Sequence, residues 1–121
     1  MTAAVRSLKV FAVYLGVLGI VLVFAPNLLL QTFGLPPTSE VWIRVVGMLV
    51  LFLAVYYWTA AGLQMVAFFR ATVLCRLTVP VFFLAFVIGG WARWPLLLFG
   101  VIDLAGALWT WWGLDRRAAT A

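Results

Sequence analysis

Long apolar runs constrain the fold of this 121-residue chain more than any other feature of its sequence. Four runs of about twenty residues are separated by short segments with glycine, proline or charge. We place them at residues 8–25, 41–62, 68–88 and 95–114. A helix of about 20 residues spans the roughly 30 Å hydrocarbon core of a bilayer. The sequence therefore predicts an all-α, integral membrane four-helix bundle, with residues 1–121 forming one transmembrane domain.

The composition supports this prediction. Hydrophobic residues make up 68% of the chain and charged residues 9%, against about a half and a quarter in soluble proteins. A soluble domain of this size has too little interior to bury so much apolar surface. We therefore expect the protein to be surrounded by the lipid bilayer and to lie in the cell (inner) membrane. The basic residues lie at the ends of the apolar runs rather than in a patch with aromatic residues, so we expect no nucleic-acid binding.

The connections between the runs contain strong helix breakers. Pro26 cannot continue a helix and predicts its end near Ala25. Residues 34–39 read as a turn in which Thr38 or Ser39 caps the next helix. A basic start followed by an apolar run also describes a secretory signal, but the junction at Ala25 is a poor cleavage site and favours a retained span.

The distribution of basic residues predicts the orientation. Four spans in an up-down-up-down order place both termini and the second connection on one side, which carries most of the arginine and lysine. Positive charge marks the cytoplasmic side, so both termini are expected in the cytoplasm. The cytoplasmic set is Arg6, Lys9, Arg70, Arg116 and Arg117, and the opposite set is Arg44 and Arg93.

One carboxylate, Asp103, lies inside the last apolar run. Gly100, Gly106 and Ala107 share its helix face, since they are three or four residues away. An ionisable group at membrane depth is costly, so this face should turn toward protein. By helix rise Arg76 reaches a similar depth, and Arg44 approaches from the other side. An Arg76–Asp103 pair, or a triad with Arg44, is therefore a candidate buried polar cluster.

Pro80 and Tyr57 complete the set of candidate site residues. Pro80 removes the helical hydrogen bond to the carbonyl of Arg76, and such discontinuities either line binding sites or are kinks satisfied by a neighbour such as Thr78. The Tyr57 hydroxyl could bind a lipid headgroup or a quinone-like ring, or the side chain could anchor its helix at the membrane interface. The cluster as a whole fits a clamp of helix register, a ligand or partner site, or a path for ions or protons.

Most catalytic chemistries lack their residues. The chain has no histidine and one cysteine, Cys75, so it offers no metal-ligand cluster and no cysteine pair. Ser7 and Ser39 have no base to activate them, and no glycine-rich phosphate loop occurs. We predict no catalytic residues, no metal and no cofactor, and hence no enzyme.

The layout resembles the DoxX-like group of small four-span bacterial membrane proteins. The resemblance lies in the chain length, the FGLPP turn at Phe33–Pro37, the Glu40 and Arg44 entry to the second span, and the acid among small residues in the fourth. It implies an accessory subunit of a quinone- or thiol-oxidising membrane complex. Direct thiol chemistry is not expected, because the chain has no pair of cysteines.

Three functions are compatible with these features. The first is a non-catalytic accessory or interaction subunit of a membrane complex, bound to another membrane protein or to a second copy. The second is intramembrane binding of a lipophilic small molecule such as a quinone or lipid. The third is a small transporter that uses Arg76 and Asp103.

Overall fold

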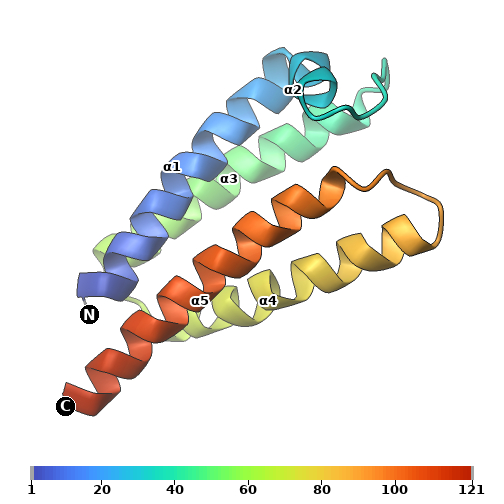
Figure 1. The fold of residues 1–121 in the computed structure, drawn as a ribbon. Helices are drawn as coiled ribbons and strands as arrows, with labels where there is room; N and C mark the ends of the chain where they lie inside the picture. The colour runs from blue at the N-terminus through green and yellow to red at the C-terminus, as the bar shows by residue number, and fades with distance from the viewer. Residues whose placement is uncertain (1, 121) are drawn as a thin grey trace.

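The computed structural model describes residues 2–120, with side chains described for residues 3–115. Within this range the chain is helical, with no strand. Four of its five helices are long and apolar enough to cross a membrane, which confirms the predicted all-helical fold with four long apolar helices. The helices (Figure 1) are α1 (Thr2–Phe24), α2 (Pro26–Thr32), α3 (Trp42–Gly62), α4 (Val66–Ile88) and α5 (Leu96–Thr120).

Two helices extend beyond the predicted spans. α1 begins at Thr2 rather than at residue 8, because its first turns pack on the protein and Ala4 and Ser7 are buried. α5 continues to Thr120 rather than stopping at residue 114, since the residues that follow include neither glycine nor proline. The predicted orientation also uses Arg116 and Arg117, whose side chains lie outside the described residues.

In the first connection, the predicted helix end before Pro26 is confirmed and the predicted helix cap is wrong. The backbone leaves the helix at Ala25 (φ −144°, ψ 58°), directly before Pro26 opens α2. The predicted capping of the next helix by Thr38 or Ser39 is wrong, because α3 begins later and has no side-chain cap. The Thr38 hydroxyl instead accepts a hydrogen bond from the Glu40 amide (3.2 Å), and the Thr38 amide donates to Asn27 on α2 (2.8 Å).

Close antiparallel contacts between α1 and α3 form one side of the bundle. A Cβ atom on Gly19 would lie 2.7 Å from Cγ of Leu51 and 2.9 Å from the carbonyl oxygen of Gly47. Gly47 in turn faces Leu22 and the backbone of Val23. Two glycines thus let the two backbones approach, as small residues do between membrane helices.

The other contacts bring α5 against both α4 and α1. Gly100 on α5 faces Pro80 on α4, with 3.1 Å between its ideal Cβ position and Cα of Pro80. Gly113 faces Ala4, so the end of α5 lies beside the start of α1 (Figure 1). α3 and α4 follow one another through a short turn but make few contacts with each other. The backbones of α3 and α4 therefore approach one another closely at fewer places than those of α1 and α3, α4 and α5, or α1 and α5.

Replacing Gly19 by alanine should destabilise the protein. The new methyl group meets backbone atoms of α3 at 2.9 Å, and such overpacking typically costs about 1–3 kcal/mol of unfolding free energy. Thermal unfolding in mild detergent should therefore show a lower midpoint for Gly19→Ala.

Gly16→Ala is the matched control on the same helix. Its methyl group would lie 3.9 Å from Cβ of Ala54, an ordinary contact, and alanine favours a helix over glycine by up to about 1 kcal/mol. We expect a midpoint equal to or slightly above wild type. Equal midpoints for the two variants would contradict the close approach at Gly19.

Candidate functional site

Arg76 lies near the middle of α4 and is only 2% exposed. Its Nε donates a hydrogen bond to the carbonyl oxygen of Thr72, one turn earlier (3.3 Å). Its Nη2 donates to the hydroxyls of Thr72 (3.1 Å) and of Thr110 on α5 (2.9 Å). A buried cation is thus held by neutral oxygen atoms rather than by a carboxylate.

The hydroxyl of Thr110 extends this network to α1. It lies 2.7 Å from the hydroxyl of Ser7, which donates to the carbonyl of Ala4 (2.7 Å). Both Ser7 and Thr110 are buried. Three helices, α1, α4 and α5, are therefore joined by one chain of hydrogen bonds that begins at the Arg76 guanidinium.

Aromatic rings cover the guanidinium. Its Cζ lies 4.7 Å from the centroid of the Phe11 ring and 5.7 Å from that of Tyr57, within the range of cation–π attraction. Gly106 makes room for this packing, because a Cβ there would lie 2.9 Å from Cδ2 of Phe11 and 3.1 Å from Nη1 of Arg76. Nη1 itself is buried and finds no acceptor among the described residues.

Asp103 lies one turn from Gly106 on α5 and is half-buried. Among the described residues, its carboxylate forms no ion pair with Arg76 within 4.0 Å. Both residues line a cavity of about 410 Å³ between the four long helices. Its walls also include Phe11, Leu53, Tyr57, Phe68, Thr72 and Cys75.

Three of the predicted site residues, Arg76, Asp103 and Tyr57, are brought together at this cavity. Arg44 is not, so the triad with Arg44 is not formed. Its side chain is exposed and its Nη1 donates to the carbonyl of Val23 at the end of α1. Distance along the bundle explains the difference, since Val23 lies about 18 Å from Phe11 by helix rise.

Pro80 is part of a helix contact rather than of the cavity wall. It lies inside a continuous α4 and packs against Gly100 of α5. The nearby Thr78 hydroxyl donates to the carbonyl of Cys75 (2.7 Å) and not to that of Arg76. The proline thus fits closely against the small residue opposite it.

The polar partners of Arg76 were missed by the sequence reasoning. Thr110 was not singled out, although it continues the helix face of Asp103, Gly106 and Ala107 at the same spacing. Thr72 precedes Arg76 by one turn and was likewise detectable. Nothing local in the sequence indicates that Ser7 meets α5.

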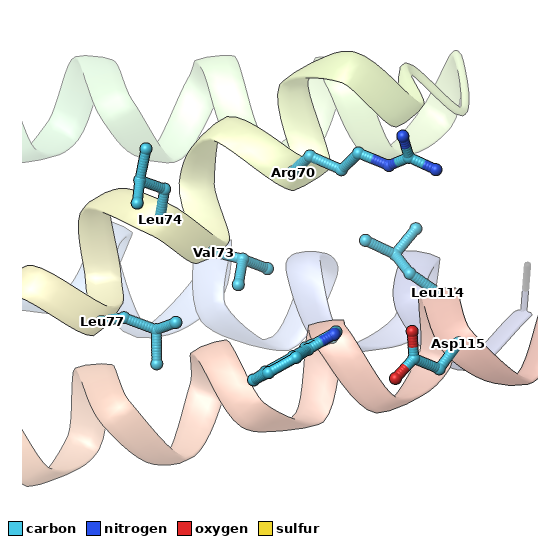
Figure 2. Close-up of a pocket in the computed structure, with 7 residues that line it drawn as sticks. Arg70, Val73, Leu74, Leu77, Leu114 and Asp115 are labelled. Carbon is cyan, nitrogen blue, oxygen red and sulfur yellow. The ribbon is translucent and has the colours of Figure 1, made fainter.

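A second hollow lies along α4 and α5, nearer the end of α5. Figure 2 shows Arg70 extending from α4 and the carboxylate of Asp115 on α5 at one end of this hollow, with Leu114 between them, and Val73, Leu74 and Leu77 further along α4. This groove measures about 350 Å³. Arg70 and Asp115 are both exposed. It therefore lacks the buried, unpartnered donor that distinguishes the Arg76 cavity.

The chain has no match among protein-family models, curated proteins or solved structures. Among the described residues, no group of three or more acidic or cysteine side chains is placed to bind a metal ion. The polar side chains that line the cavity are one cation, one carboxylate, two hydroxyls and one thiol, a set able to bind a polar group by hydrogen bonds.

Substituting Thr110 by valine should destabilise the bundle. Valine keeps the shape but removes the acceptor of Arg76 Nη2 and the partner of Ser7. A buried donor left without its acceptor costs about 1–3 kcal/mol, so thermal unfolding should show a clearly lower midpoint.

Thr78→Val makes the same change elsewhere on the bundle. Thr78 is exposed and bonds only to the backbone of its own helix, so its midpoint should stay near wild type. If Thr110→Val is as stable as Thr78→Val, the network does not hold the helices together.

Proposed function

We propose that this protein is a non-catalytic, multi-pass membrane protein that binds the polar end of a lipophilic small molecule, such as a quinone or lipid, between its helices. The observation that carries the proposal is the Arg76 side chain, which lines the 410 Å³ cavity and whose buried Nη1 has no acceptor among the described residues. Unsatisfied buried donors are rare and call for a partner.

The remaining wall residues suit such a ligand. Ligand cavities are mostly apolar, with a few polar groups that orient the bound molecule. Here Phe11, Leu53 and Phe68 offer apolar surface, while Tyr57 and Thr72 add hydroxyls beside the two charges. The scarcity of contacts between α3 and α4 favours entry of the ligand from the side, through lipid.

Filling the cavity should remove the bound molecule without removing any of its polar groups. Ala71 lies on the cavity wall and is exposed, so Ala71→Phe places a ring in the ligand's space. Native mass spectrometry of protein purified in mild detergent should show a retained lipophile on wild type. The retained fraction should fall about tenfold or more in the variant, equivalent to about 1.4 kcal/mol of binding.

Ala67→Phe is the matched control. Ala67 is exposed one turn earlier on α4 and is not among the residues that line the cavity. It should retain the molecule as wild type does. Loss in both variants, or a retained species in neither wild type nor control, would contradict binding at this cavity.

We further propose that the four long helices cross the inner membrane in up-down-up-down order with both termini in the cytoplasm. Arg6, Lys9 and Arg70 support this orientation, because they lie near the end of the bundle where α1 begins. The Lys9 ammonium also lies over the Trp58 ring, 5.0 Å from its centroid. Amphipathic side chains of this kind are enriched at the membrane interface.

Single cysteines should report this orientation in a Cys75→Ser background. Ser39→Cys lies in the first connection and Leu63→Cys in the second, and both positions are exposed. A membrane-impermeant maleimide should label Ser39→Cys from the periplasmic side, and Leu63→Cys only after the membrane is permeabilised. The reverse pattern would place the termini outside.

A second candidate function is that of an accessory subunit of a membrane complex, as the resemblance to DoxX-like proteins implies. The small number of close backbone contacts between α3 and α4 favours it, because a helix of another protein placed there would cover the same cavity. Co-purification in mild detergent tests this role, and a chain that always migrates alone would count against it.

A further inference from the structure

The charges on the cavity wall restrict the headgroup that fits there. Among the residues that line the cavity, Arg76 on α4 and Asp103 on α5 are the charged ones. Their charges sum to zero when both are ionised. A net charge added far from bulk water is expensive unless an opposite charge compensates it. An uncharged headgroup keeps the balance that the two side chains already provide.

The residues that line the cavity also include both a hydrogen-bond donor and a hydrogen-bond acceptor. Nη1 of Arg76 supplies N–H donors without an acceptor, on a side chain only 2% exposed. The carboxylate of Asp103 can only accept when ionised, and the described side chains and backbone donate no hydrogen bond to it. The side chains that line the cavity thus include a donor group on α4 and an acceptor group on α5.

We propose that the cavity selects an uncharged lipid whose head carries both an oxygen acceptor for Arg76 and a hydroxyl donor for Asp103, as in a monoacylglycerol. This inference rests on the proposed function and specifies its ligand class. An anionic head would set two negative charges against one positive charge. An ester without a hydroxyl would leave Asp103 without a donor.

Three probes with the same oleoyl chain separate these cases. Monoolein is uncharged and carries hydroxyls, methyl oleate is uncharged without a hydroxyl, and 1-oleoyl lysophosphatidic acid adds an anionic phosphate to the glycerol head. Each is titrated against the full chain in a non-ionic detergent, with native mass spectrometry as the readout. We expect the Kd for monoolein to be lower than for either other probe by about tenfold or more.

The variant Asp103→Asn removes the negative charge from the wall. The Arg76 cation then has no opposing carboxylate at the cavity, so the anionic probe should gain relative to monoolein by about tenfold or more. Glu40→Gln is the matched control, because it removes an exposed carboxylate outside the cavity. It should keep the wild-type order of the three probes.

Two results would overturn the inference in distinguishable ways. If wild type binds the anionic probe or methyl oleate as tightly as monoolein, and Ala71→Phe abolishes that binding, the headgroup class is wrong while the cavity still binds lipid. If no probe binds wild type better than it binds Ala71→Phe, the proposed function fails as well. The order of the three probes on wild type decides the headgroup class even if Asp103→Asn does not fold.

Discussion

The buried guanidinium of Arg76 is the group around which the helices are arranged. A cation in the middle of an apolar bundle must find compensation locally, because water is remote. Its hydrogen bonds go to Thr72 and Thr110, and its faces meet Phe11 and Tyr57. These partners come from four different helices. Any slip of one helix along another would separate the cation from part of its shell.

Small residues make this arrangement possible. Gly106 leaves space for both the guanidinium and Phe11, and Gly19 with Gly47 brings α1 against α3. Because α1 packs closely on α3 and also on α5, and α4 packs on α5, the facing sides of α3 and α4 are left with few contacts. The cavity lined by Arg76 and Asp103 lies between these four helices.

Several features of the fold were predictable because they depend on neighbouring residues alone. The four long apolar helices follow from hydropathy and length, and the break before Pro26 follows from the missing amide hydrogen. The cap of α3 was predicted wrongly, because Thr38 is held by Asn27, eleven residues earlier. The helical turns of α1 before residue 8 likewise depend on distant residues, since Ala4 and Ser7 are buried by contacts with α5.

Hydropathy and length alone were enough to predict a set of apolar helices, and helix rise was enough to predict that Arg76 and Asp103 lie at comparable heights along the bundle, because it converts residue number into height. The partners of each charge follow from the three-dimensional packing alone. Those depend on which helices are neighbours and how each is rotated about its axis, which is set by packing across the whole bundle. This is why Thr110 rather than a carboxylate receives the Arg76 hydrogen bond, and why Arg44 turns to α1 instead.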